Sequence, residues 1–186
     1  TGGQWAHAEG YMTTGSAQYS HAEGNEALAS GNSSHAEGRQ TVASGFASHS
    51  EGLFAIASND GAHAEGYSAT ASGYAAHAEG KNTTASGQYS HAEGWTSTAS
   101  GDYAHAEGSG SVAVGIASHA EGWLTTTYGS GSFAAGLGTI ASGPTDGADP
   151  TTTQAVFGKY NVQDSSSIFV IGDGTSNSNR HDAIRV

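Results

Sequence analysis

A four-residue word, His-Ala-Glu-Gly, recurs every fourteen residues along this chain. It begins at His7, His21, His35, His63, His77, His91, His105 and His119, and His49-Ser50-Glu51-Gly52 fills the remaining slot in phase. Nine occurrences at one period, without an insertion or deletion, are typical of a solenoid in which each repeat stacks on the one before. The period therefore limits the fold more than any single residue does.

The composition of the 186-residue chain points to a thin core. The chain has 29 glycines, and only 12% of its residues are charged. Its low hydrophobicity therefore does not indicate a chain kept disordered by charge repulsion. Large aliphatic side chains are scarce, and we predict an interior lined by Ala, Ser, Thr and Gly. The formal net charge is −12, and nine of the 17 acidic residues are the repeat glutamates. With only five Lys and Arg residues, a nucleic-acid partner is disfavoured, because phosphate binding needs basic side chains.

The location of the protein is indicated only broadly. The chain has no cysteine, which suits an extracellular protein that does not use disulfides. No apolar run approaches the roughly 18 residues of a membrane span, so we expect no membrane insertion in this stretch. The chain starts at Thr1 and shows no signal peptide, and we expect it to be a piece of a longer protein.

A second, looser word divides each repeat into seven plus seven residues. Ala-Ser-Gly ends at Gly31, Gly45, Gly73, Gly87, Gly101 and Gly143. Seven residues suit a short strand and a tight turn, and side chains alternate between the two faces of a strand. Ala22 then faces inward, with His21 and Glu23 outward. A helix fails as an alternative, because glycine at every seventh position costs about 1 kcal/mol each. We predict an all-β, parallel β-solenoid with two short strands in each 14-residue coil.

One variant of the repeat carries a family resemblance. Ser111-Val112-Ala113-Val114-Gly115 resembles the Ser-Val-Ala-Ile-Gly word of YadA-like trimeric autotransporter adhesin heads. The Ser-His-Ala-Glu-Gly version is also similar to bacteriophage tail-fibre proteins. The resemblance covers about residues 4–143. It implies a left-handed parallel β-roll, a homotrimer, and attachment to a host-surface glycan or matrix protein from a bacterial cell surface or a virion tail fibre.

The resemblance also suggests which face meets the sister chains. In that family the Ser-Val-Ala-Ile-Gly strand faces the trimer axis, which would place the His and Glu columns there. The resulting trimer-interface candidates are His7, Glu9, His21, Glu23, His35, Glu37, His49, Glu51, His63, Glu65, His77, Glu79, His91, Glu93, His105, Glu107, His119 and Glu121. Buried carboxylates must be paired, and a His–Glu hydrogen bond between chains would pair them. We favour this arrangement.

The opposite assignment stays open. The outward column of the other strand is more apolar, and it would then face the axis while His and Glu formed a solvated ladder. That column consists of Leu28, Val42, Ile56, Thr70, Thr84, Thr98, Val112, Thr126 and Ile140.

His and Glu are also metal ligands, and His21, Glu23, His35 and Glu37 form the candidate metal ladder. We prefer a structural His–Glu pair and expect neither a metal nor another cofactor. Catalysis is disfavoured, because a catalytic group occurs once in its own tuned environment and not nine times. We therefore predict that the protein is not an enzyme.

Large aromatic side chains gather at the turns. Tyr11, Tyr67, Trp95 and Trp123 follow the His-Ala-Glu-Gly words in one column, and we take them as surface-contact candidates. An exposed aromatic ring stacks on a sugar or anchors a protein contact. The alternative is that these rings pack between neighbouring chains or over turn glycines.

We divide the chain into a repeat domain at 1–143, a linker at 144–153 rich in Pro, Gly, Asp and Thr, and a β-rich capping or neck segment at 154–186 that is truncated. Strand-like runs in that last segment lie at 155–157, 167–171 and 183–186. The predicted function is a non-enzymatic attachment head. The alternatives are a rigid spacer that holds a binding tip elsewhere and an ice-binding solenoid, although the Thr column is mixed with Leu, Val and Ile.

Overall fold

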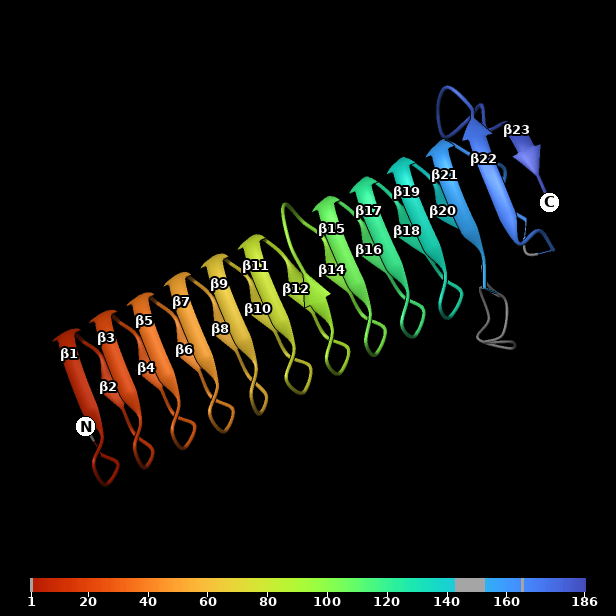
Figure 1. The fold of residues 1–186 in the computed structure, drawn as a ribbon. Helices are drawn as coiled ribbons and strands as arrows, with labels where there is room; N and C mark the ends of the chain where they lie inside the picture. The colour runs from red at the N-terminus through yellow and green to blue at the C-terminus, as the bar shows by residue number, and fades with distance from the viewer. Residues whose placement is uncertain (1, 143–152, 165) are drawn as a thin grey trace. The chain divides into compact units, whose positions relative to one another are not determined.

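The computed structural model describes residues 2–142, 153–164 and 166–186. The chain forms two compact units, Thr1–Glu93 and Gly94–Val186. The described residues of both units contain strands and turns and no helix, so none of them forms a helix that could cross a membrane. The predicted class is confirmed: the protein is an all-β, parallel β-solenoid (Figure 1).

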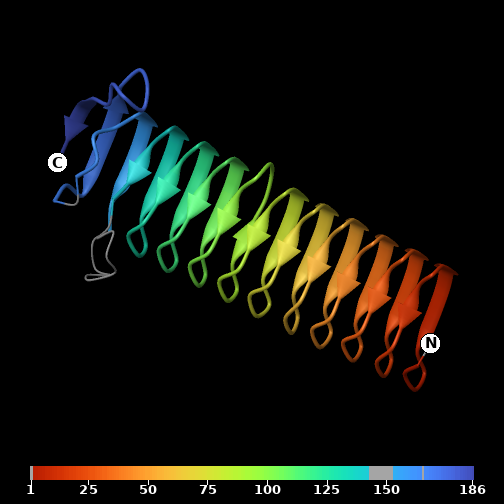
Figure 2. The same ribbon diagram turned by 180° about the vertical axis from the view of Figure 1, so that it is seen from behind.

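In the first unit, every coil contributes one longer and one shorter strand, and each kind forms its own parallel sheet. The longer strands are β1 (His7–Tyr11), β3 (His21–Asn25), β5 (His35–Arg39), β7 (His49–Leu53), β9 (His63–Tyr67), β11 (His77–Lys81) and β13 (His91–Ala92). The shorter ones are β2 (Thr14–Gly15), β4 (Leu28–Ala29), β6 (Val42–Ala43), β8 (Ile56–Ala57), β10 (Thr70–Ala71) and β12 (Thr84–Ala85). The register sets each residue beside the residue at the same position of the next repeat, as with His21 beside His35. Figures 1 and 2 show the two layers joined by turns at both edges.

The second unit continues the same pattern and then changes it. Its longer strands are β15 (His105–Ser109), β17 (His119–Trp123), β19 (Phe133–Leu137), β21 (Ala155–Lys159) and β22 (Phe169–Asp173), all parallel, with β23 (Asp182–Arg185) antiparallel to β22. Its shorter strands are β14 (Thr98–Ala99), β16 (Val112–Ala113), β18 (Thr126–Thr127) and β20 (Ile140–Ala141). The three strand-like runs predicted near the end of the chain correspond to β21, β22 and β23.

The interior is as thin as the composition predicts. Ala22, Ala36 and Ala43 are fully buried between the two sheets of the first unit, while the side chains of His21 and Glu23 lie outward. The predicted alternation of faces is therefore confirmed. In the second unit the interior widens only at the end, where Val156 and Val170 join the alanines.

Two glycine positions of the coil lie in close contact with the next coil. Gly66 has φ +107°, and a Cβ there would lie 2.2 Å from the carbonyl oxygen of Gly80. The φ of Gly73 is not in the positive range, but a Cβ added there would lie 1.9 Å from the carbonyl oxygen of Gly87. Because each glycine meets the backbone of the next coil, a Cβ at Gly66 or Gly73 would force the backbone to shift. The Gly66 position is glycine in every repeat from Gly10 to Gly136, whereas Ala17 and Asn59 fill the Gly73 position in two other coils.

The corners of each coil also use the left-handed region, but with ordinary residues. Tyr19 has φ +58° and Ala75 has φ +48° at one corner, and Gln40 has φ +54° at the other. The sequence alone indicates only that these turn positions vary. The repeated positive φ comes from closing a coil in seven-residue halves, and it explains why glycine takes the same places at Gly61 and Gly110.

Two buried amides follow the last short strand. The Oδ1 of Asn161 accepts a hydrogen bond from the Ile140 N–H at 2.7 Å, and its Nδ2 donates to the Ile140 carbonyl at 2.9 Å. The Oε1 of Gln154 accepts one from the Ser142 N–H at 2.9 Å. These side chains satisfy backbone groups that a further strand would otherwise pair. The predicted linker, 144–153, lies outside the described residues apart from Thr153, so the division into three segments stays a prediction.

The close approach of coils predicts a contrast between two glycines of the first unit. Gly66→Ala should lower the free energy of unfolding by at least about 3 kcal/mol, because it combines an unfavourable φ with a clash against backbone. Gly61→Ala is the matched control: its φ is +64° and its Cβ would meet only Ala75, with the methyl group at 3.6 Å, so we expect a loss of no more than about 1 kcal/mol. Denaturant unfolding at fixed protein concentration measures both. Equal losses would contradict the stacking argument.

Candidate functional site

The most regular surface feature of the first unit is a stack of imidazole rings. His35 and His49 have ring centroids 4.8 Å apart with 3° between planes, and His49 and His63 repeat the same spacing and angle. The cause is local: parallel, in-register pairing of the longer strands sets each histidine directly beside the next. Histidine on histidine is therefore a direct consequence of the fourteen-residue period.

In the second unit the stack is shorter and ends on an aromatic residue. The rings of His105 and His119 lie 4.6 Å apart and are tilted by 28°. The next ring is Phe133, which meets His119 edge-on at 5.2 Å. The histidine column thus passes into a phenylalanine on the same face of the same sheet.

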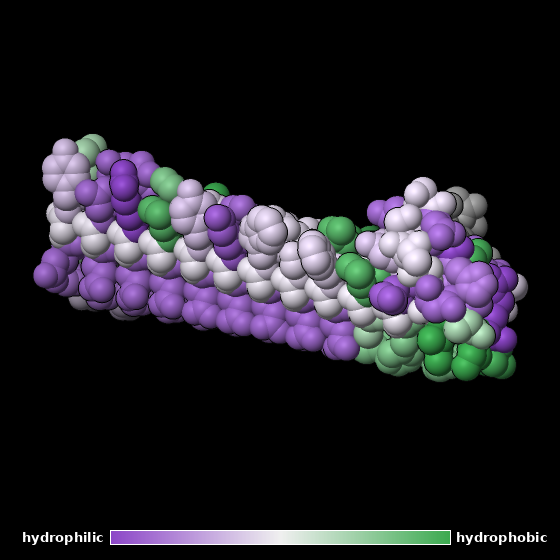
Figure 3. Space-filling view, turned by 90° about the horizontal axis from the view of Figure 1, so that it is seen from above, coloured by the Kyte–Doolittle hydropathy of each residue, from purple (hydrophilic) through white to green (hydrophobic). Residues whose placement is uncertain are grey.

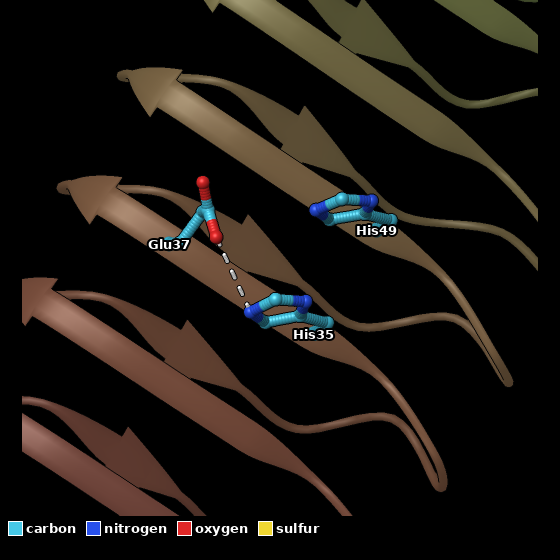
Figure 4. Close-up of side chains that lie close together, drawn as sticks. All are labelled: His35, Glu37 and His49. Carbon is cyan, nitrogen blue, oxygen red and sulfur yellow. Dashed lines mark ion pairs between the residues drawn. The ribbon is translucent and has the colours of Figure 1, made fainter.

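The repeat glutamates run beside the histidines and pair with them inside one chain. The Nε2 of His35 lies 3.5 Å from the Oε2 of Glu37, and about a third of each side chain is exposed, 35% and 38% (Figure 4). Some histidines reach the glutamate of the preceding coil instead, as His77 does with Glu65 at 3.8 Å. The sequence predicted His–Glu pairs between chains, whereas the structure shows that one chain already provides such pairs.

The pKa values of some groups in the two columns depart from their usual range. Side-chain hydrogen bonds with Glu79 and Glu51 raise the pKa of Glu65 to about 7. Burial, followed by the charge of the neighbouring histidine, lowers the pKa values of His77 and His119 below their usual range. The folded chain thus favours neutral imidazoles and a carboxyl group that keeps its proton near neutral pH.

Several imidazole nitrogens are poorly satisfied. The Nε2 atoms of His35, His49, His63, His77 and His119 are shielded from solvent and lack a hydrogen-bond partner within the described part of the chain. Buried polar atoms are normally hydrogen-bonded, and the glutamate contacts of these histidines, such as the 3.5 Å from the His35 Nε2 to Glu37, are long for a hydrogen bond, so a closer partner would satisfy these atoms better.

At the end of the second unit the same face becomes apolar. The register continues the glutamate column from Glu121 through Ala135 and Phe157 to Ile171 and Ile184. Phe157 is 39% exposed, and its ring lies 5.3 Å from Phe133 and 5.9 Å from Phe169. Figure 3 shows hydrophobic surface gathered at the C-terminal part of the chain next to hydrophilic surface. The His-Ala-Glu-Gly period ends before these residues, so the sequence pattern does not connect them into a face.

The predicted aromatic contact residues are all exposed, at or just beyond the ends of the longer strands: Tyr11, Tyr67, Trp95 and Trp123. Tyr67 also packs within the chain, edge-on to Phe54 at 5.8 Å and with the Lys81 Nζ 5.5 Å above its ring. At the opposite corner, Trp5 and Tyr19, which are one repeat period apart, stack with ring centroids 5.1 Å apart.

These features define a repeat protein of the β-solenoid class. Residues 22–48, 64–90, 92–118 and 106–122 match the family model described as YadA head domain repeat (2 copies). Over these residues the chain is therefore similar to YadA head domain repeats, and its fold is consistent with a YadA-like, adhesin-type head. No curated protein gives a significant match to the chain.

The raised pKa of Glu65 predicts a pH-dependent effect of Glu65→Gln. The folded pKa is about 7 against 4.5 for the ordinary carboxyl group, so its contribution to stability is fully present below about pH 4.5 and is lost as the pH rises through about 7. Gln does not ionise, so the variant should gain thermal stability relative to the original chain between pH 4 and pH 8. Unfolding midpoints at a series of pH values measure the difference.

The source of the shift has its own control. Because Glu79 is the largest cause, the pH-dependent gain should shrink when Glu65→Gln is made in a Glu79→Gln background. A stability difference between the original chain and the Glu65→Gln variant that stays constant with pH would contradict a raised pKa of Glu65 caused by hydrogen bonds with its neighbouring glutamates.

Proposed function

We propose that the chain is the non-enzymatic head of an extracellular attachment fibre, either a bacterial surface adhesin or a phage tail fibre. Three copies assemble through the outward face of the longer-strand sheet, and the coil is left-handed. YadA head domains occur in surface-exposed adhesins, which supports a location outside the cell. The repeat match and the solenoid fold support the head role, and the face described above supports the mode of assembly.

The observation that carries the assembly is the apolar end of that face in the second unit. Phe133, Phe157, Phe169 and Ile171 share it with His119 and Glu121, in continuous register. A contiguous apolar patch beside a polar column marks a surface that another protein covers. A second copy is the natural occupant, since identical chains present identical columns and give the same match on each side.

The His and Glu columns tolerate burial in such an assembly better than two columns of fully charged side chains would. Charged groups resist burial because they lose solvation. Here burial lowers the pKa values of His63 and His77, and hydrogen bonds raise the pKa of Glu65 and lower that of Glu79, so fewer full charges need to be desolvated at the first three of these positions. The unpaired Nε2 atoms then find hydrogen-bond partners on a sister chain.

The other face remains a poorer candidate. In the second unit the shorter strands and the residues directly after them present Val112, Val114, Tyr128 and Ile140 on this face, interrupted by Thr98, Ser100 and Thr126. It has no aromatic cluster comparable to Phe133, Phe157 and Phe169 among the described residues.

Contact with a host glycan or matrix protein is assigned to the turn aromatics. Tyr11, Tyr67, Trp95 and Trp123 recur at one edge of the coils and are exposed, which suits stacking on sugars or anchoring a protein contact. A pure spacer would bind neither ligand, so a binding screen on immobilised glycans and matrix proteins separates the two roles.

The assembly is tested by the mass of the full chain in dilute buffer. We expect a trimer, and Phe157→Glu should dissociate it, because the substitution places a charge in the apolar part of the proposed interface. Val112→Glu is the matched control on the opposite face of the same unit and should leave the mass unchanged.

Two other outcomes of these mass measurements would contradict the proposed interface. A folded monomer would overturn the proposed assembly. Dissociation by Val112→Glu with no effect of Phe157→Glu would move the interface to the shorter-strand face. Circular dichroism on both variants verifies that the fold is retained.

A further inference from the structure

The His and Glu columns bring metal-ligating atoms together in triads. In one of them, the ligating atoms of His35, Glu37 and His49 all lie within 4.8 Å of one another (Figure 4). Within the described residues there are four such groups: His35-Glu37-His49, Glu51-His63-Glu65, His77-Glu79-His91 and His105-Glu107-His119. No residue belongs to two of these groups. Each group takes its ligands from two successive coils. His21 and Glu23, which the sequence placed in a candidate metal ladder, form an ion pair at 3.7 Å and are outside these groups.

Two imidazole nitrogen atoms of one triad are shielded from solvent and make no hydrogen bond to any described residue. The Nε2 atoms of His35 and His49 are shielded from water and have no hydrogen-bond partner within the described residues. In Figure 4 both imidazole rings present a ring nitrogen on the side where the Glu37 carboxylate lies. A neutral imidazole nitrogen in this situation offers its lone pair, which is the form that binds a metal ion.

The charge of this surface also favours a cation. Each coil adds a glutamate that stacks on the next, as Glu37 does on Glu51, and the two columns contain no Lys or Arg. The basic residues nearest in sequence are Arg39 and Lys81, each exposed at the end of its strand, two positions after Glu37 and Glu79. A divalent ion would offset carboxylate charge that the chain itself leaves without a basic partner on this face.

We propose that these triads bind a borderline divalent transition-metal ion, of which Zn²⁺ is the representative. Two imidazole nitrogens and one carboxylate oxygen suit zinc, whereas calcium and magnesium favour sites made of oxygen atoms alone. In a single chain this face is half-buried, so water fills the remaining coordination positions; in the proposed trimer a side chain of a sister copy takes them instead. All three ligands come from one chain, so the site does not depend on the proposed trimer.

Binding requires a small movement of the rings. Zinc–ligand distances are about 2.0–2.2 Å, so three ligand atoms around one ion must come closer together than 4.8 Å. The rings of His35 and His49 are parallel to within 3°, and tilting brings their nitrogens toward a shared point. The 28° tilt between His105 and His119 shows that the column accommodates such a rotation.

The test is a Zn²⁺ titration of the full chain, followed by calorimetry, with Ca²⁺ titrated in parallel. We expect saturable zinc binding at up to four sites per chain, one for each triad, and little calcium binding. The combined variant Glu37→Gln, Glu79→Gln and Glu107→Gln removes the carboxylate from the three His-Glu-His triads. It should lose about three of the four sites and keep the Glu51-His63-Glu65 site.

A charge-matched control separates coordination from simple attraction. Glu26→Gln, Asp60→Asn and Asp102→Asn together remove the same number of acidic groups from the turns, outside the triads, and zinc stoichiometry should not change. The proposal is overturned by no saturable zinc binding, by equal binding of calcium, by unchanged binding to the triad variant, or by equal loss in the control. The mass of each sample, measured in the same buffer, reports the trimer separately.

Discussion

Backbone hydrogen bonds between residues of successive coils, at nearly the same position in each repeat, hold this protein together. The His21 N–H donates to the Ser34 carbonyl at 2.9 Å, and the Leu28 N–H donates to the Thr41 carbonyl at 2.9 Å, so both sheets are tied in the same way. Such close stacking leaves no room for a side chain where two backbones meet. Glycine at the coil edges and alanine or serine inside follow from this one constraint.

The same constraint determines the chemistry of the surface. When coils stack without a shift in register, every outward side chain lies beside its own kind, so a charged position becomes a column of like charges. Hydrogen bonds with its glutamate neighbours raise the pKa of Glu65, and burial, followed by the charge of a neighbouring histidine, lowers the pKa values of His63 and His77. The proposed trimer and the proposed metal sites are two ways to satisfy what this column leaves unpaired: a sister chain offers hydrogen-bond partners, and a divalent ion offers charge and coordination. Both act on the face that becomes apolar at Phe133 and Phe157.

The sequence predicted much of this fold because its information is periodic. The period gave the coil, the alternation of Ala22 with His21 and Glu23 gave the faces, and the runs near 155, 167 and 183 gave the last strands. What it did not predict depends on contacts between distant residues. Asn161 reads as an ordinary turn residue until it meets Ile140, 21 positions away. Phe157 reads as part of a strand until the register sets it beside Ala135 in the glutamate column. The positive φ at Tyr19 and Gln40 is hidden as well, because many residue types occupy those corners.

The central claim is that this chain folds only because its inward side chains are tiny. Ala64 and His63 are neighbours on β9, with Ala64 fully buried and His63 outward. Denaturant unfolding of Ala64→Leu and His63→Leu, at the same protein concentration, tests the claim most directly. We predict that Ala64→Leu lowers the free energy of unfolding by about 3 kcal/mol or more, and His63→Leu by about 1 kcal/mol or less. An Ala64→Leu chain as stable as the original would show that the interior has room, and that the close stacking of coils is not what selects this sequence.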